Sequence, residues 1–355
     1  MTGARPGIRE SVVRGWRAIH ATSDMLEVTV LPDKGADIYA ITDLRSGIDP
    51  LFKAPWGLQP PGSPPRAGSD GAAFLENYEG GWQELFPNTN DPASYRGIAL
   101  PFHGEVATLP WSWSAVGDDS GETAVRFTVG CRLTPFRLER TMRLPHGGRR
   151  LVLDERVTNL SASTAHFTWG HHCVLGPPLV GEGAELRIPC RTIITGAEPW
   201  EDTARLVPGQ RSNWPMARCR DGGLADLSRI PGPETGSHDD VFLTGLDGGW
   251  AELANPARGW GSGSTGIPRC SGGSSRGSHT GGPAPCRCAA PTRSGSSRGP
   301  RAATSRLRWP TEAPWNCRGT VTSRPRLPPP SPAGEAPSAA EVAPPGGPPL
   351  RAPAY

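Results

Sequence analysis

Short segments in which apolar and polar side chains alternate recur through the first 255 residues. In Arg137–Leu144 an apolar residue occupies every second position, so one face of an extended chain would pack on a core while the other faces water. No window of helical length keeps a regular 3.6-residue period. The pattern predicts an all-β fold, a large antiparallel β-sandwich. The expected strands are Met25–Leu31, Ala36–Thr42, Ala124–Leu133, Phe136–Leu144, Arg150–Val157, Ala165–Trp169, Ala184–Ile188 and Asp240–Leu243.

Composition and charge divide the 355-residue chain into two parts. Residues 1–255 carry 24 Lys and Arg against 31 Asp and Glu, whereas residues 256–355 carry 13 Arg against 3 Glu. Only 6 of the last 100 residues are Val, Ile, Leu, Met or Phe. So little apolar surface cannot offset the backbone entropy lost on ordering, roughly 1–2 kcal/mol per residue. We expect one folded domain at 1–255 and a disordered, Pro/Gly/Arg/Ser-rich tail at 256–355.

The sequence also argues against several classes of protein. No stretch approaches the roughly 20 apolar residues of a membrane span, and the first 20 residues lack the apolar segment of a secretory signal. The basic tail has no interleaved aromatic residues, so we expect no nucleic-acid partner. Because the sequence shows neither a membrane span nor a secretory signal, we expect a cytoplasmic protein. No metal site is expected, because the four cysteines of the body form no CxxC pair: Cys131, Cys173, Cys190 and Cys219.

Polar groups able to carry chemistry gather in four short segments. Glu79–Asn88 combines two glycines with Trp, Gln and Asn, a mixture of stacking surface and amide groups that suits a sugar. Pro101–Val106 contributes one histidine, and Trp169–Pro178 contributes two adjacent ones. Adjacent histidines on a strand point to opposite faces, so only one of them can enter a given pocket. His238–Phe242 brings acidic residues into the start of a strand.

In this order, the segments resemble the aldose 1-epimerase (galactose mutarotase-like) family over roughly residues 25–258. The matching pieces are Leu31–Ala36, Gly80–Asn88, Phe102–Gly104, Val157–Asn159, Trp169–His172 and the Asp-x-x-Phe sequence that starts at Asp239. The resemblance implies a β-sandwich whose concave face binds a hexose without metal or organic cofactor. It also implies interconversion of the α and β anomers, in which a histidine protonates the ring oxygen and a carboxylate removes the anomeric hydroxyl proton.

The resemblance assigns a role to each matching residue. His172 corresponds to the general acid, although Val174 and Leu175 replace the aromatic residues that follow it in the family, which leaves His171 open as the alternative. His103 resembles the second histidine of the catalytic pair. The expected sugar-binding residues are Asp239, Gln83, Asn88 and His171.

The glutamate that serves the family as general base in a late strand is missing. The tail holds only Glu312, Glu335 and Glu341, none of them in a strand-like setting. A reading frame shifted by one base just after Gly259 would restore it, because TGG followed by AAY at Trp315–Asn316 then reads GAA, a glutamate codon. The Pro, Ala, Arg and Gly excess of the tail is also typical of a GC-rich gene read out of frame. We therefore expect the chain as written to be poorly soluble and inactive.

Two alternative functions remain open. A sugar-binding or sensor module on the same fold would need no base, which the missing glutamate favours. An epimerase of phosphorylated hexoses would need basic side chains around the pocket, for which Lys53 and Arg96 are the candidates. The acidic body argues against an anionic substrate.

Overall fold

The computed structural model describes residues 6–63, 74, 77–89, 91–116, 121–199 and 202–256, together with the backbone of three short segments at 260–265, 286–287 and 319–321. All of them belong to one unit, which ends at Ser323. Its regular structure is almost entirely β, and every pair of neighbouring strands within the sheets is antiparallel. The predicted all-β antiparallel sandwich is confirmed.

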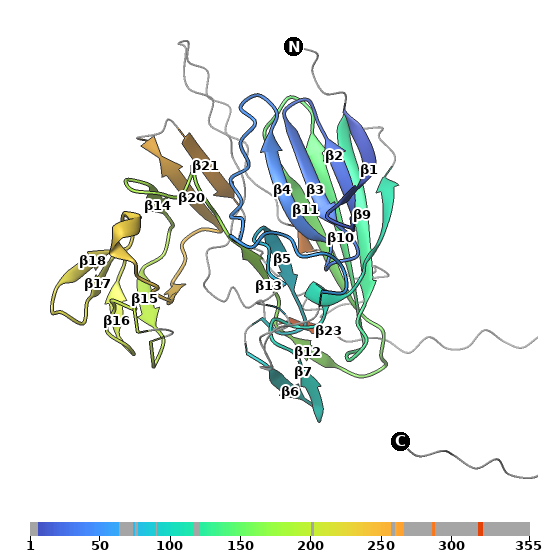
Figure 1. The fold of residues 1–355 in the computed structure, drawn as a ribbon. Coiled ribbons are helices and arrows are strands. Elements are labelled where there is room, and N and C mark those ends of the chain that lie inside the picture. The colour runs from blue at the N-terminus through green and yellow to red at the C-terminus, as the bar shows by residue number, and fades with distance from the viewer. Residues whose placement is uncertain are drawn as a thin grey trace, which may run out of the picture. The chain divides into compact units, whose positions relative to one another are not determined.

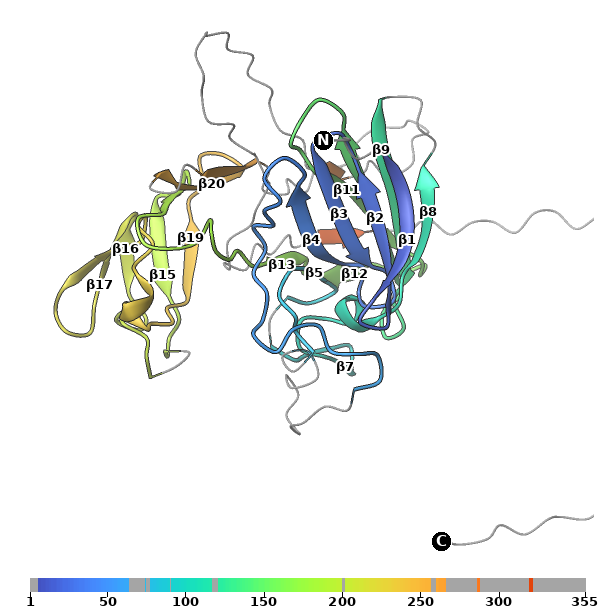
Figure 2. The same ribbon diagram turned by 45° about the horizontal axis from the view of Figure 1, so that its top comes forward.

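Two large sheets face each other (Figures 1 and 2). The first has the order β1-β2-β3-β4-β5-β13 and consists of β1 (Gly7–Val13), β2 (Trp16–Thr22), β3 (Leu26–Leu31), β4 (Asp37–Asp43), β5 (Trp82–Leu85) and β13 (Gly170–Cys173). The second has the order β22-β11-β10-β9-β8 and consists of β22 (Cys286–Arg287), β11 (Val152–Asn159), β10 (Phe136–Pro145), β9 (Glu122–Gly130) and β8 (Ser112–Val116).

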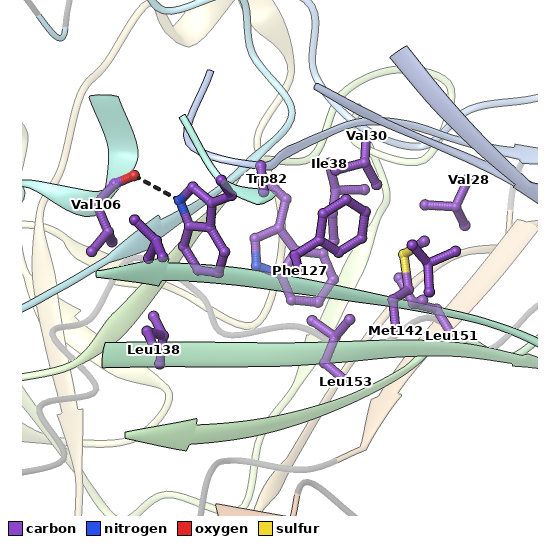
Figure 3. Packing of buried hydrophobic residues seen from close by; sticks show 14 of the residues in the cluster. Val28, Val30, Ile38, Trp82, Val106, Phe127, Leu138, Met142, Leu151 and Leu153 are labelled. Atoms are coloured by element: carbon purple, nitrogen blue, oxygen red, sulfur yellow. Dashed lines mark hydrogen bonds between the residues drawn. The ribbon is translucent and has the colours of Figure 1, made fainter. Parts of the chain in front are cut away.

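The core of the sandwich lies between these two sheets. Along β10 the burial alternates residue by residue, with Leu138 and Met142 fully buried and Arg137 exposed. The apolar side chains of β10 and β9 meet those of β3 and β4, as Figure 3 shows for Phe127 and Ile38. Because the alternating strands each contribute one apolar face, a single continuous core joins the sheets.

Smaller sheets form the later part of the body around a second core, to which Ile193, Leu206 and Leu243 belong. They are β14-β20-β21, β16-β15-β19 and the hairpin β17-β18. Their strands are β14 (Glu185–Arg187), β15 (Thr192–Thr195), β16 (Arg211–Asn213), β17 (Met216–Arg218), β18 (Leu224–Asp226), β19 (Val241–Thr244), β20 (Trp250–Asn255) and β21 (Trp260–Thr265). The remaining elements are β6 (Ala93–Tyr95), β7 (Ile98–Leu100), β12 (Ala165–Phe167), β23 (Gly319–Val321) and two 3-10 helices, η1 (Val106–Thr108) and η2 (Pro233–Thr235).

Three of these strands lie beyond residue 255, where the sequence pattern predicted none. β21 pairs with β20, and the two short strands β22 and β23 pair with β11 and β12. The rest of the predicted tail, and with it the predicted disorder, lies outside the described residues. The domain boundary at residue 255 therefore stays a prediction.

The alternating burial of β10 generates a stability prediction. Leu138→Ala removes a side chain that is fully buried between the sheets, so we expect it to lower the free energy of unfolding by about 2–5 kcal/mol. Leu133→Ala is the matched control, because Leu133 is 42% exposed and its truncation should cost under about 1 kcal/mol. Urea denaturation of the two variants measures both values. Equal losses would show that β10 does not face the core as described.

Candidate functional site

The pairing of β5 with β13 sorts the polar residues of both strands onto two faces of the first sheet. Gln83 lies directly opposite His172, and Glu84 lies directly opposite His171. Since side chains alternate along a strand, these two pairs point to opposite sides of the sheet. Glu84 and His171 point toward the second sheet, where each contacts charged residues of β10 and β11. The predicted separation of the two adjacent histidines is therefore present, and it places His172 on the outer face.

His172 belongs to a group of five rings on that outer face, the histidine–aromatic cluster: Phe74, Tyr78, Phe102, His103 and His172. The ring centroids of His172 and His103 are 5.4 Å apart. Tyr78 and Phe74 contact His172 edge to face, at 5.1 and 5.7 Å between centroids. Phe102 lies against His103 at 3.8 Å. Two imidazoles framed by aromatic faces suit a ligand that has apolar C–H surface and several hydroxyl groups.

A sharp turn brings His103 to this cluster. His103 and Gly104 have positive φ angles of 62° and 79°. A Cβ atom at Gly104 would lie 2.3 Å from the carbonyl oxygen of Phe86, so only glycine permits this approach. The following residue, Glu105, is buried and accepts hydrogen bonds from the backbone N–H groups of Arg132 and Leu133 at 2.6 and 2.9 Å. The turn is thereby fastened to the β9–β10 connection of the second sheet.

Behind His172 lies a buried polar group formed by Lys34, Asp37 and Glu79, which we call the lysine–carboxylate group. The Nζ atom of Lys34 is 2.8 Å from Asp37 Oδ2 and 2.6 Å from Glu79 Oε2. Burial raises the pKa of Glu79 to about 8, while Lys34 opposes this shift. Burial also raises the pKa of Asp37. The pKa of Lys34 is lowered by burial, but the two carboxylates outweigh that effect and raise it overall.

Gln83 links this group to His172. Its Nε2 atom donates to the Gly80 carbonyl at 2.8 Å and to Asp37 Oδ2 at 3.4 Å, and its Oε1 atom lies 3.3 Å from His172 Nδ1. Gln83 is only 1% exposed. The sequence suggested Gln83 as a sugar-binding residue, but the structure engages both ends of its amide within the protein.

The opposite face of the β5–β13 pair carries a buried charged cluster, composed of Glu84, Arg140, Glu155 and His171. His171 Nε2 is 3.1 Å from Glu155 Oε2, and Nδ1 is 3.6 Å from Glu84 Oε2. Arg140 Nη1 lies 3.4 Å from Glu84 Oε2, and Trp169 Nε1 donates to Glu84 Oε1. His171 is therefore held between the sheets, on the side of β13 away from His172.

The charges of this cluster perturb one another. Burial lowers the pKa of His171, but Glu84 and Glu155 outweigh it and raise that pKa to about 9. Burial, together with the neighbouring Glu155, raises the pKa of Glu84 to about 8. Burial alone would raise the pKa of Glu155, but His171 lowers it to about 2. Trp82 Nε1 donates to His171 Nδ1 at 3.1 Å, which requires that Nδ1 of the neutral ring carries no hydrogen.

Glu84, Glu155 and His171 could also be considered as metal ligands, since each has a donor atom within 4.8 Å of the others. Two carboxylates and an imidazole are a common donor set for a divalent cation. Here, however, Arg140 and His171 already lie against the two carboxyl groups. The cluster therefore serves to join the two sheets.

The remaining predicted sugar-binding residues, Asn88 and Asp239, lie in different places. Asn88 is buried, and its Nδ2 donates to the Pro101 carbonyl at 2.9 Å, which holds the turn that carries His103. Asp239 accepts from the backbone N–H groups of Arg205 and Leu206 at 2.7 and 3.0 Å. It lines a cavity of about 350 Å³ whose lining residues include neither His172 nor His103. Among the described residues, Asn88 is thus bonded to the turn that carries His103, whereas Asp239 is bonded to Arg205 and Leu206.

The basic residues considered for a phosphorylated substrate are engaged elsewhere. Lys53 Nζ is 2.6 Å from Asp49 Oδ2 and lies over the Tyr39 ring. Arg96 donates to the Thr164 carbonyl at 2.7 Å. Neither the Lys53–Asp49 ion pair nor the hydrogen bond from Arg96 to Thr164 involves His172.

The sequence did not predict that Lys34, Asp37 and Arg140 belong to the buried polar groups around β5 and β13. Lys34 lies in the matching piece Leu31–Ala36 and Glu79 directly precedes Gly80–Asn88, but nothing in the sequence shows that the two side chains approach across 45 residues of chain. A lysine and two carboxylates near the ends of apolar segments were the available signal, because such charges can be buried only in pairs.

Comparison with known proteins decides the family. A family model described as a domain of unknown function, DUF4432, matches residues 13–261, more than half of the chain. The chain belongs to the DUF4432 family. The match ends two residues after Gly259, where the reading frame is predicted to change. No curated protein is similar in sequence to this DUF4432 member at a significant level.

Several solved structures are similar to the DUF4432 chain. The Slr1438 protein of Synechocystis shares 18% identity over 73% of this chain and 76% of its own, with a TM-score of 0.47. A galactose mutarotase-like protein of Clostridium acetobutylicum shares 14% over 71% and 78%, with a TM-score of 0.44. A Klebsiella pneumoniae protein provisionally described as an aldose 1-epimerase shares 20% over 55% of this chain and 53% of its own, with a TM-score of 0.48. The match thus spans about half of the Klebsiella protein.

A separate finding concerns membranes. Within the part of the DUF4432 chain that the structure describes, no helix has the length and apolar character that a membrane crossing needs.

The buried charged cluster generates a pH prediction for this DUF4432 protein. The pKa of His171 rises from 6.5 to about 9 on folding, so its contribution to stability is fully present below about pH 6.5 and is lost as pH rises through about 9. We expect His171→Gln to lower the free energy of unfolding by about 3 kcal/mol near pH 6, because it breaks a buried pair. That difference from the wild type should shrink toward pH 9.5.

Urea denaturation at pH 6, 7.5 and 9.5 measures this difference. His146→Gln is the matched control, because the His146 ring lies at Thr123, outside the buried charged cluster, and its effect should not follow the same pH course. A difference between wild type and His171→Gln that stays constant from pH 6 to 9.5 would contradict the assigned charges.

Proposed function

We propose that the protein binds a hexose or a related aldose at the histidine–aromatic cluster and that this site interconverts α and β anomers by acid–base catalysis. The observation that carries the proposal is the placement of His172 beside His103, 5.4 Å apart between ring centroids, within a frame of three aromatic rings. The sugar would lie against the aromatic faces, and the two imidazoles would reach its oxygen atoms.

His172 would act as the general acid. Anomer exchange requires protonation of the ring oxygen while the proton of the anomeric hydroxyl is removed; the ring then opens at the C1–O5 bond, C1 becomes an aldehyde and rotates, and reclosure gives the other anomer. His103 would hold the sugar and share the charge that develops on its oxygen. No cofactor takes part in this sequence, since protons are the only species exchanged.

The base remains the unassigned part of the mechanism. The resemblance implies a late glutamate, and Glu312, Glu335 and Glu341 all lie outside the described residues. The proposal therefore includes the shifted frame, which restores a glutamate at the codons of Trp315–Asn316. The end of the family match at residue 261 supports a change of frame at Gly259.

A second candidate function is sugar binding without turnover by the chain as written. It would keep the histidine–aromatic cluster, which depends on β5, β13 and the turn at His103 and thus on residues before 256. A hexose-phosphate epimerase has less support, because Lys53 and Arg96 are bound to other groups.

The test compares mutarotation of galactose and glucose by polarimetry in the restored-frame protein and in the chain as written. We expect the restored-frame protein to exceed the spontaneous rate and His172→Gln in that protein to lose about 10²- to 10⁴-fold in kcat. His146→Gln should keep full activity, because it removes a histidine outside the site. Binding without turnover in both proteins would support the sugar-binding module instead, and no binding at all would refute the proposal.

Resequencing of the gene tests the frame itself. The expected result is one additional base shortly after the Gly259 codon, with a glutamate codon in place of Trp315–Asn316. An intact present frame, or turnover by the chain as written, would sink the frameshift hypothesis.

A further inference from the structure

Gln83 is the only side chain of β5 placed directly opposite His172 in the antiparallel ladder, and its amide orientation can be derived from its neighbours. The Nε2 group faces the Gly80 carbonyl oxygen at 2.8 Å and the Asp37 carboxylate at 3.4 Å. The Gly80 carbonyl oxygen, the nearer of the two, can only accept a hydrogen bond. An amide turned the other way would set its own oxygen against the Gly80 carbonyl oxygen, so the NH₂ end must point to Gly80, and with it to Asp37.

This orientation leaves the Oε1 atom of Gln83 facing His172 Nδ1 at 3.3 Å. An amide oxygen carries no hydrogen, so the hydrogen of this bond must come from the imidazole. The neutral ring of His172 therefore carries its hydrogen on Nδ1, and Nε2 is its basic nitrogen. Addition of a proton then takes place at Nε2, while the Nδ1–H bond to Gln83 is unchanged.

We propose that Gln83 is a positioning residue that fixes His172 in the Nδ1–H form, so that Nε2 is the atom that carries the transferable proton. The catalytic consequence of this inference rests on the proposed function, because the acid step needs one defined nitrogen to carry the proton. The geometry on which it stands is independent of any turnover. It also replaces the direct sugar contact that the sequence suggested for Gln83, which acts here through His172.

The lysine–carboxylate group keeps Gln83 in place. Asp37 Oδ2 receives both Lys34 Nζ at 2.8 Å and Gln83 Nε2 at 3.4 Å. Asp37 is fully buried, and Lys34 is also bound to Glu79 at 2.6 Å. Lys34 opposes the larger effect of burial on the pKa of Asp37, and its contact with Oδ2 holds the carboxyl group that faces Gln83.

The glycine at position 80 completes the support. A Cβ atom there would lie 2.0 Å from the Phe52 carbonyl oxygen, and the φ angle is +94°. Only glycine lets the chain pass so close to Phe52 before β5. The turn at this glycine places the Gly80 carbonyl where the Gln83 side chain can donate to it.

The experiment reads the tautomer directly, in the full-length protein without sugar. Protein labelled with ¹⁵N-histidine is examined by long-range ¹H–¹⁵N NMR at a pH where the His172 ring is neutral, with the signal assigned by its loss in His172→Gln. We expect the Nδ1–H pattern in the wild type. In Gln83→Met, which has a similar size and no strong acceptor, the ring should gain the Nε2–H form that free imidazole side chains prefer.

Two further variants separate the hydrogen bond from general damage. Gln83→Glu keeps an oxygen that can face Nδ1, and its second oxygen, when protonated, can donate to the Gly80 carbonyl as the amide does, so Nδ1 should remain protonated. Gln210→Met is the matched control, because Gln210 also makes three hydrogen bonds, to Val207 and Arg218, at a place that does not include His172. Loss of the Gln210 amide in this variant should leave the His172 signal unchanged.

The outcomes are distinguishable from those of the proposed function. An Nε2–H pattern in the wild type overturns the inference outright and needs no variant to fold. An unchanged Nδ1–H pattern in Gln83→Met overturns it as well. If the Nδ1–H pattern is present in the wild type and lost in Gln83→Met, the inference stands even where mutarotation is absent, and only the proposed function then fails.

Discussion

The antiparallel pairing of β5 with β13 is the constraint on which the rest of the site depends. Its register sets Gln83 against His172 and Glu84 against His171. A slip of β13 by one residue would exchange the faces of His171 and His172. His172 would then enter the space between the sheets, and His171 would leave its two carboxylates unmatched. Core packing on one side and polar pairing on the other thus specify the same register.

The two sides of this strand pair solve the problem of buried charge in different ways. Toward the second sheet, His171 and Arg140 balance Glu84 and Glu155, and the cluster ties β5 and β13 to β10 and β11. On the other side, Lys34 supplies the positive charge within the lysine–carboxylate group, and Asp37 of that group holds Gln83. A buried charge without a partner strongly destabilises the fold. A buried charge that is paired with an opposite charge is compensated, and the pair fixes the positions of the neighbouring side chains.

Much of the fold could be predicted from the sequence where one face of a strand is polar. Phe136–Leu144 and Met25–Leu31 nearly coincide with β10 and β3. β5 was missed because Trp82–Leu85 is buried on both faces and shows no alternation of apolar and polar residues. β13 was missed because Gly170–Cys173 has histidines at two successive positions, so that neither face reads as apolar from the sequence.

The site was predictable in its ingredients but not in its connections. The motifs singled out His103, His172 and Gln83, and the opposite directions of adjacent histidines followed from strand geometry alone. Which of His171 and His172 faces outward depended on the register with β5, which no local pattern encodes. The contact of Lys34 with Glu79 depended on a close approach of distant loops.

The central claim is that His172 and His103 face the ligand while His171 is sealed between the sheets. Titration of ¹⁵N-histidine-labelled protein with galactose or glucose tests it most directly, because each imidazole reports on its own surroundings. The account predicts that the signals of His172 and His103 move and saturate together, while that of His171 stays in place. Movement of the His171 signal without that of His172 would contradict it.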